Sequence, residues 1–270
     1  MGSDLPTLIG QRFISRKDVK AVQNSDGSYM PDRHPWKMDD LRAHIAGTKT
    51  FGHYLVDQNN MTKLFAFDID LVKGNDKNPT PGYWFDLDDQ SEVDLGVVPC
   101  DPRAVWLEKD HPGRKWLTLQ LRCCAEALAL KAKTLFEDDL HIAMAYSGGK
   151  GLHVYGFFPE PVEASFARKS AVNILKAFNR PDGRPGFEPS RGTNFWVSTQ
   201  EKQHNYEIEV YPKQDSLEGK DLGNLLRLPL GVNRKTGQKG FFLDGRSQLY
   251  EFKMMDPTSV LSGELPWDDW

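Results

Sequence analysis

The 270-residue sequence has few cysteines, only Cys100, Cys123 and Cys124. An odd number, with two of them adjacent, argues against a disulfide framework and indicates a reducing compartment, so we expect a cytoplasmic protein. No apolar run approaches the ~18–20 residues that a membrane helix needs. The first residues also lack the apolar segment of a signal peptide. We therefore expect no membrane as a partner.

Internal repeats and low-complexity linkers are also missing, and no excess of one charge marks the whole chain. Hydrophobic residues make up 39% and aromatic residues 11%, which is typical of a folded protein rather than a disordered one. A chain of this length can bury one large core or two intimate subdomains. The sequence therefore indicates a folded globular protein.

The net charge of -4 conceals two opposing regions. Residues 82–101 carry six acids and no Lys or Arg, whereas residues 220–246 carry six basic side chains against two acids. Both regions could be ordinary solvated surface. Because they cancel in the total, the net charge does not exclude a nucleic-acid partner.

The residue pattern predicts an α/β (α+β) protein with a mixed sheet. Residues 73–113 are rich in Gly, Pro and Asp and indicate a long irregular insertion, a kind of segment that is usually functional or disordered. Apolar periodicity and turn signals predict the regular elements. They are a helix over 39–46, a hairpin of strands near 52–56 and 64–71, a helix over 116–136, strands over 143–146 and 152–158, a helix that starts at Pro161, and a strand over Tyr206–Tyr211. In the helix over 116–136 the apolar stripe is predicted at Leu119, Cys123, Ala127, Leu130 and Leu135.

The segment Phe65-Ala-Phe-Asp-Ile-Asp-Leu71 alternates strictly between apolar residues and a second set that includes Asp68 and Asp70. On a strand these two carboxylates share one face, roughly 6–7 Å apart between Cα atoms. That spacing suits one or two Mg²⁺ or Mn²⁺ ions. The wet face of an edge strand is the alternative. Apolar flanks favour a central strand, in which a carboxylate needs a partner or a metal.

The segment Tyr206-Glu-Ile-Glu-Val-Tyr-Pro212 repeats this alternation. Catalysis of phosphoryl transfer by divalent ions usually requires a third carboxylate from a neighbouring strand. We choose Glu209 for this role, with Glu207 as the fallback. A surface strand with two solvated glutamates is the alternative.

The segment Ser147-Gly-Gly-Lys-Gly-Leu-His153 combines three glycines with groups that bind phosphate. The glycines let a ligand approach the backbone, while Lys150 offers a point charge and Ser147 and His153 offer directional hydrogen bonds. The spacing differs from that of a Walker A loop. A plain hairpin turn is the alternative, but the composition favours a polyphosphate site.

Two basic segments follow. Arg227 stands among leucines, where an arginine usually has an anionic partner such as a carboxylate or a phosphate. The turn Asn233-Arg-Lys-Thr-Gly237 could contact a nucleic-acid backbone. Zinc is not favoured, because Cys100, His111, Cys123 and Cys124 lack the short Cys-x₂₋₄-Cys spacing.

These segments, in this order, resemble the catalytic domain of the archaeo-eukaryotic primase superfamily. The matching segments are Asp68-Ile-Asp70, the glycine turn, Glu209-Val-Tyr-Pro212 and Gly223-Asn-Leu-Leu-Arg-Leu-Pro229. The glycine turn is also similar to that of polymerase domains attached to bacterial end-joining ligases. The N-terminal segments Gly27-Ser-Tyr29 and His44-Ile-Ala-Gly47 resemble primase-polymerases of mobile elements, conflict systems and CRISPR-associated loci. The sequence departs from the family at two positions, with Glu209 in place of the usual aspartate and Asn233 in place of a frequent histidine.

The resemblance implies a single catalytic domain over residues 1–270, in which an RRM-like sheet packs on an N-terminal α/β module. It also implies template-directed addition of nucleoside monophosphates from NTP or dNTP, with single-stranded DNA template and primer as partners. Other domains of a longer chain, or CRISPR and replication proteins, are further implied partners. The implied roles are metal binding for Asp68, Asp70 and Glu209, nucleotide binding for Ser147, Lys150, His153, Lys220 and Arg227, and nucleic-acid binding for Asn233, Arg234, Lys235 and Lys239.

Two other functions remain open at this point. A metal-dependent nuclease or phosphodiesterase could use the same carboxylates, although hydrolysis needs no triphosphate site. A catalytically inactive RRM-like module could bind nucleic acid without chemistry. Such modules depend on exposed sheet aromatics, whereas this sheet offers aspartates.

Overall fold

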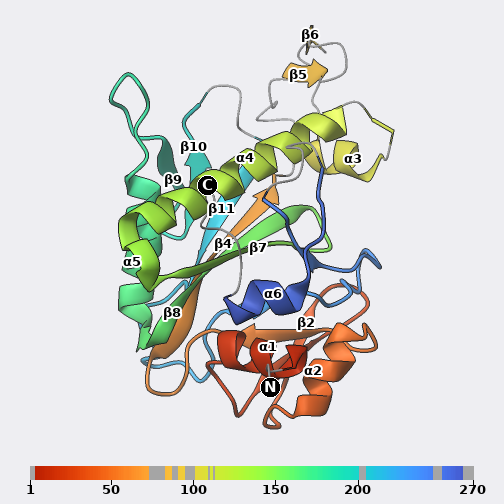
Figure 1. The fold of residues 1–270 in the computed structure, drawn as a ribbon, viewed down its shortest axis with the longest axis vertical. Helices are drawn as coiled ribbons and strands as arrows, with labels where there is room; N and C mark the ends of the chain where they lie inside the picture. Colours follow the sequence, from red (N-terminus) through yellow and green to blue (C-terminus); the bar gives the residue numbers. More distant parts are fainter. Residues whose placement is uncertain are drawn as a thin grey trace.

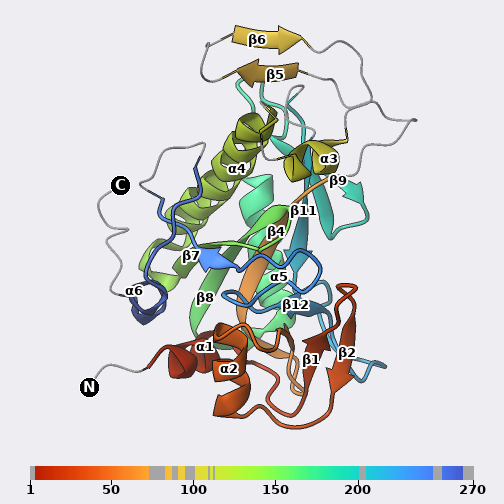
Figure 2. The same cartoon turned by 90° about the vertical axis from the view of Figure 1, so that its right-hand side faces the viewer.

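The computed structural model describes residues 4–72, 83–86, 91–94, 101–108, 110–111, 113–200, 205–245 and 251–263. These residues form two antiparallel sheets with helices on their faces, together with a separate two-stranded hairpin (Figures 1 and 2). The predicted α/β (α+β) class is therefore confirmed. The predicted mixed sheet is wrong, because all the described strand pairs are antiparallel. None of the described helices is long and apolar enough to cross a membrane.

The larger sheet has seven strands in the order β13-β7-β8-β4-β11-β10-β9. Its centre is β4, which pairs with β8 on one side and β11 on the other. The bounds are β4 Met61–Leu71, β7 His141–Tyr146, β8 Gly151–Glu163, β9 Phe187–Arg191, β10 Phe195–Ser198, β11 Tyr206–Tyr211 and β13 Phe241–Phe242.

Helices α4 (Gly113–Phe136) and α5 (Ala164–Lys176) cover one face of this sheet (Figure 2). The strict alternation of β4 explains why. Phe65, Phe67 and Ile69 are fully buried in the core beneath these helices. The same core contains Ile208 and Trp196 from β11 and β10, so one side of three neighbouring strands forms a continuous apolar surface.

The smaller sheet has the order β12-β3-β1-β2 and covers part of the opposite face. Its strands are β1 Lys20–Gln23, β2 Tyr29–Asp32, β3 Phe51–Tyr54 and β12 Leu225–Arg227. Helices α1 (Leu5–Phe13), α2 (Met38–Ile45) and α6 (Pro257–Ser262) accompany it. Leu64 and Ala66 of β4 are buried in this second core, whereas Asp68 and Asp70 lie further along the same face, at its border.

Three predictions about elements are wrong. The strands near 52–56 and 64–71 form no hairpin, because β3 belongs to the smaller sheet and β4 to the larger one. The helix predicted at Pro161 starts at Ala164, since β8 continues through Pro161 to pair Val162 and Glu163 with the start of β4. The predicted apolar stripe of α4 is also displaced, because its buried positions are Leu117, Leu121, Cys124 and Leu128 rather than Leu119, Cys123, Ala127, Leu130 and Leu135.

The predicted insertion over 73–113 contains regular structure where the chain is described. Strands β5 (Tyr83–Asp86) and β6 (Ser91–Asp94) form an antiparallel hairpin, and α3 (Pro102–Leu107) follows. An Asp101 side chain caps α3 by accepting from the Arg103 N–H, which explains where this helix begins. The structure describes no side chains for residues 82–100 of the predicted acidic segment, which include Cys100. Arg246 of the predicted basic segment also lies outside the described residues.

Candidate functional site

The site centres on the two aspartates of β4, at the border of the second core. Asp68 lies directly opposite Glu209 of β11, and Asp70 lies opposite Glu207. Residues paired in this way have side chains on one face, with Cβ atoms about 4.5–5.5 Å apart. The sheet therefore brings the three predicted metal ligands, Asp68, Asp70 and Glu209, to one place.

Each of these carboxylates has a cationic or polar neighbour. The Asp70 carboxylate accepts from the Lys150 ammonium, and Asp68 Oδ1 is 3.3 Å from Nε2 of His153, the residue opposite it on β8. Glu209 pairs with Lys213 and accepts a 2.9 Å hydrogen bond from the Tyr211 hydroxyl. Glu207 is directed to the sheet edge, where it pairs with Arg191.

The surroundings shift the pKa values of the two aspartates in opposite directions. Burial alone would raise the pKa of Asp68, but the charges of His153, Lys150 and Arg227 outweigh it and hold the pKa below its ordinary value. Burial and the negative charge of Asp68 raise the pKa of Asp70, against the pull of Lys150. The pair therefore shares its negative charge unevenly.

The glycine turn brings its polar groups to the aspartates because β8 runs antiparallel to β4. Gly148 has a φ of +70°, which an L side chain rarely adopts. Gly151 lies opposite Asp70, and a Cβ atom there would collide with the Ile69 carbonyl and the Asp70 carboxylate. Only glycine allows this approach, which places Lys150 next to Asp70.

The smaller sheet supplies the opposite wall of the site. Arg227 of β12 donates to the Ser147 carbonyl, so the two sheets are joined at the glycine turn. Tyr29 of β2 lies near Arg227, and burial raises the pKa of its hydroxyl to about 12, which leaves it protonated at neutral pH. Together the walls enclose a cavity of about 290 Å³, lined among others by Asp68, Asp70, Ser147, Lys150, His153 and Arg227.

Comparison with protein families decides the assignment. Residues 10–188 and 190–262 match the family described as "TOTE conflict system, Archaeo-Eukaryotic Primase domain". The chain belongs to this family.

Family membership confirms the predicted resemblance and supports nucleotidyl transfer at the level of the primase-polymerases. No curated protein matches the sequence. Among solved structures, the "Polymerase Domain from Mycobacterium tuberculosis Ligase D in complex with DNA" is similar, with 13% identity and a TM-score of 0.46 over 96% of this chain and 85% of that chain.

The remaining predicted residues of this archaeo-eukaryotic primase domain lie in three places. Asn233 and Lys235 line the same cavity as the aspartates. Arg234 and Lys239 instead donate to backbone carbonyls at and just beyond the end of α2. Lys220 lies apart, in a hollow that it shares with Arg16, Gln58 and Asp221.

Sequence reasoning missed Tyr29 and Gln23, which line the cavity from the hairpin of β1 and β2. Tyr211 was part of the segment Tyr206–Pro212 but had no predicted role, and Lys213 was not singled out. Tyr29 was part of an N-terminal segment that resembled the family, which was the available signal. Its approach to β4 depends on how the two sheets pack, and no local pattern encodes that.

Two of the four residues considered for zinc are described as free cysteines of α4. Cys123 and Cys124 are consecutive on α4, and burial raises the pKa of Cys124 to about 12, which keeps its thiol protonated. His111 lies outside that helix, and Cys100 is outside the described residues.

The carboxylate oxygens of the site are ligands that a divalent ion such as Mg²⁺ prefers. Their side chains are not oriented around a common point in this structure. In the described part of the chain, no three or more His, Cys, Asp or Glu side chains form a group that could hold a metal ion. The carboxylates instead face Lys150, His153 and Lys213. However, Asp68 Oδ1 is buried without a hydrogen bond, because the His153 contact lacks hydrogen-bond geometry. A hard cation would satisfy this oxygen.

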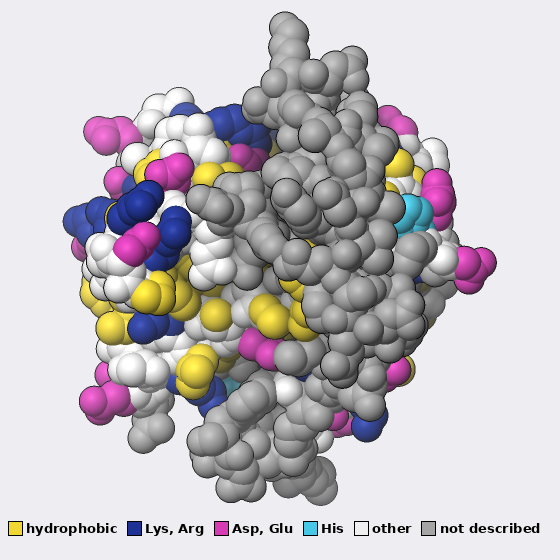
Figure 3. Space-filling model, turned by 90° about the horizontal axis from the view of Figure 1, so that it is seen from above, with side chains coloured by type: hydrophobic (Ala, Val, Ile, Leu, Met, Phe, Trp, Pro, Cys, Tyr) yellow, Lys and Arg dark blue, Asp and Glu magenta, His cyan; other side chains and the backbone are white. Residues whose placement is uncertain are grey.

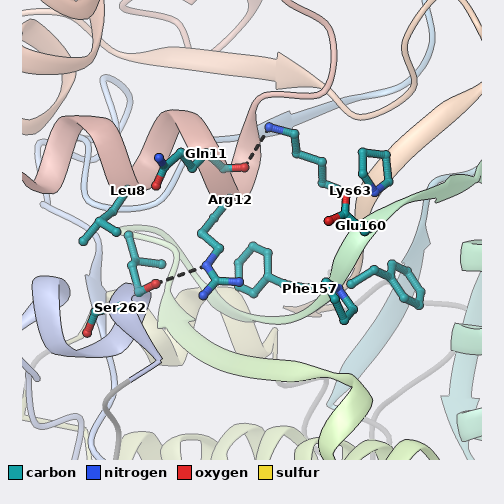
Figure 4. Close-up of a pocket in the computed structure, with 11 residues that line it drawn as sticks. Leu8, Gln11, Arg12, Lys63, Phe157, Glu160 and Ser262 are labelled. Atoms are coloured by element: carbon teal, nitrogen blue, oxygen red, sulfur yellow. Dashed lines mark hydrogen bonds between the residues drawn. The ribbon is translucent and has the colours of Figure 1, made fainter. Parts of the chain in front are cut away.

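A second hollow, of about 410 Å³, lies between α1, α6 and the far end of β8 (Figure 4). Arg12 donates to the Leu261 carbonyl at 3.1 Å, and Lys63 donates to the Gln11 carbonyl at 2.7 Å. Both cations are therefore already bound to backbone carbonyls of α6 and α1. The hollow contains none of the predicted site residues.

Proposed function

We propose that this chain is a template-dependent nucleotidyltransferase, which adds nucleoside monophosphates from NTP or dNTP to a nucleic-acid 3′-hydroxyl or to an initiating nucleotide. One observation carries the proposal. The strand register aligns His153, Asp68 and Glu209 directly across β8, β4 and β11, next to the Lys150 turn. Carboxylates and phosphate-binding groups therefore meet at one cavity, and family membership supports the same activity.

In this proposal the glycine turn and Arg227 bind the triphosphate. Lys150 and Arg227 supply positive charge from the two walls of the cavity. The Tyr155 hydroxyl is 2.7 Å from His153 Nδ1, and a hydrogen bond donated to Nδ1 leaves the proton on Nε2, the nitrogen nearer to Asp68 and the cavity. His153 is thus oriented to donate to an anionic oxygen.

Asp68, Asp70 and Glu209 would hold Mg²⁺ or Mn²⁺. When bound, such ions lower the pKa of the attacking hydroxyl and neutralise charge on the departing pyrophosphate. The chain's own contribution is to fix the positions of the carboxylates through strand pairing. The Tyr211 hydroxyl holds Glu209 in this row by its hydrogen bond.

The test uses the full chain with a labelled primer on a single-stranded DNA template, Mg²⁺ or Mn²⁺, and each nucleotide pool in turn, with and without primer. We expect primer extension by wild type and none by Asp68→Asn. An exposed carboxylate on α2, Asp39→Asn, is the control and should keep full activity. Full activity of Asp68→Asn would refute the proposed site.

The same assay separates the rival functions. A nuclease would shorten the labelled strand whether or not nucleotides are present. An inactive binding module would retain nucleic acid equally well in EDTA and would make no product.

A further inference from the structure

The row of residues across the larger sheet continues beyond the carboxylates. On this face Asp68 pairs with Glu209, Glu209 pairs with Phe195 of β10, and Phe195 pairs with Arg191 of β9. Successive cross-strand partners have side chains on one face of a sheet. An aromatic ring and then a cation therefore follow directly after the acidic residues.

Two cations contact the Phe195 ring. The Arg191 guanidinium lies 4.2 Å from its centroid and the Lys213 ammonium 5.4 Å from it. Lys213 is also 4.8 Å from the Tyr211 ring, which lines the cavity. We call these three residues, Arg191, Phe195 and Lys213, the Phe195 platform. It is continuous with the cavity through Tyr211.

Core packing does not account for an aromatic side chain at Phe195. Its neighbour Trp196 is buried in the core beneath α4 and α5. Phe195 is only partly buried and belongs to neither large apolar core in the described part of the chain. Arg191, beside the ring, is more than half exposed, so the platform includes an accessible cation. Figure 3 shows Lys and Arg side chains interspersed with Asp and Glu on the left of the view.

The direction of the row indicates what the platform would bind. In nucleotidyl transfer, the attacking and leaving oxygens lie roughly in line on opposite sides of the phosphorus. The triphosphate groups of the proposed site, Lys150 and His153, are on the β8 side of Asp68. The attacking 3′-hydroxyl must then approach from the β11 side, where the platform lies.

We infer that the Phe195 platform binds the 3′-terminal nucleotide of the strand being extended. This inference rests on the proposed function. The base stacks on Phe195, an interaction that tolerates any sequence because every base has a π-face. Arg191 pairs with Glu207, and Lys213 with Glu209. The guanidinium has five N–H donors, so Arg191 can contact a phosphate while it keeps Glu207.

The experiment compares primer extension by wild type, Phe195→Ala and Phe195→Leu, with Phe166→Ala as a matched control. Phe166 is half exposed on α5, on the other side of the sheet. Loss of one stacked base should raise the KM for primer–template by roughly 5- to 150-fold. The KM for the nucleotide should change less than about two-fold, since the triphosphate groups are untouched. Phe195→Leu, which keeps an apolar side chain, should show the same defect.

A second readout does not depend on catalysis. A 2-aminopurine at the primer 3′ end should lose fluorescence on binding in EDTA, and Phe195→Ala should abolish this change while the same probe in the template responds equally in both proteins. An unchanged primer KM and an unchanged probe response in Phe195→Ala would overturn the platform alone. In wild type, a response of the template probe without a response of the primer probe would overturn the assignment of the platform to the primer end. Absence of any synthesis by wild type would instead overturn the proposed function.

Discussion

At the scale of single residues, the site balances three carboxylates against nearby cations. Lys150 contacts Asp70, Lys213 contacts Glu209, and His153 faces Asp68. The opposite pKa shifts of Asp68 and Asp70 follow from this arrangement, because the cations favour the charge on Asp68 and the charge on Asp68 disfavours that on Asp70. A polyphosphate entering this cavity would compete with the carboxylates for Lys150.

Lys150→Ala should therefore weaken nucleotide binding more than primer binding. Loss of a charge-assisted contact is worth roughly 1.5–3 kcal/mol, so we expect the nucleotide KM to rise about 10- to 150-fold. Steady-state extension with varied nucleotide and fixed primer measures this change. Lys176→Ala, an exposed lysine on α5, is the control. A nucleotide KM equal to that of wild type would count against the triphosphate site.

His44 is a buried titratable residue that supports the smaller sheet. Its Nδ1 accepts from the Phe51 N–H at 3.0 Å, so its Nε2 carries the proton and donates to the Pro229 carbonyl at 2.9 Å. Burial lowers the pKa of His44 to about 4. In the unfolded chain the pKa is about 6.5, so the unfolded state binds the extra proton first as pH falls.

The contribution of neutral His44 should be complete above pH ~6.5 and should decline as pH falls toward about 4. His44→Gln should be less stable than wild type at pH 7.5, and this difference in unfolding free energy should narrow by about 3 kcal/mol at pH 4. Denaturant unfolding at several pH values measures it, with the exposed His34→Gln as control. A difference that stays constant with pH would show that His44 does not titrate as described.

At the scale of elements, the sequence predicted well those strands whose pattern is local. The alternation over 65–71 and the strand Tyr206–Tyr211 appear as expected, because each has one buried and one polar face. The same reasoning misplaced the start of α5, since Pro161 suits both a helix start and an exposed strand end. Strands β9 and β10 were not predicted at all. Their placement beside β11 depends on long-range pairing.

Gly151 shows how one element fixes the geometry of another. Because a Cβ atom at Gly151 would collide with the Ile69 carbonyl and the Asp70 carboxylate, Gly151→Ala should force β8 away from β4 at the site. We expect loss of extension activity and destabilisation of about 1–3 kcal/mol. Activity and thermal unfolding measure the two effects. Gly10→Ala in α1, where a Cβ would make only an ordinary 3.4 Å contact with Leu41, should have neither. Wild-type behaviour of Gly151→Ala would remove the steric argument for this glycine.

At the scale of the whole molecule, the cavity exists only because two sheets meet. The sequence predicted Asp68, Asp70, Lys150 and His153 as one site, since they lie on adjacent strands or turns. The resemblance also implied a nucleotide-binding role for Arg227, but no local pattern predicted that β2 would place Tyr29 in the same cavity. The same resemblance implied binding roles for Lys220, Arg234 and Lys239. However, Arg234 and Lys239 donate hydrogen bonds to backbone carbonyls at the end of α2. Composition marks a residue as basic, but packing decides which surface it faces.

The second core, which joins the two sheets, is closed by α6 near the end of the described chain. Leu261 of α6 is fully buried beside Ile9 and Phe13 of α1, against Phe157 of the larger sheet. Leu261→Ala should therefore destabilise the protein by about 2–5 kcal/mol. Leu135→Ala, at a largely exposed position of α4, should cost less than about 0.5 kcal/mol. Because the core spans both sheets, their hydrogen-exchange protection should fall together in Leu261→Ala, although the mutation lies far from the aspartates. Protection lost only in the smaller sheet would show that the two sheets unfold independently and that the cavity depends on a weaker contact than this core.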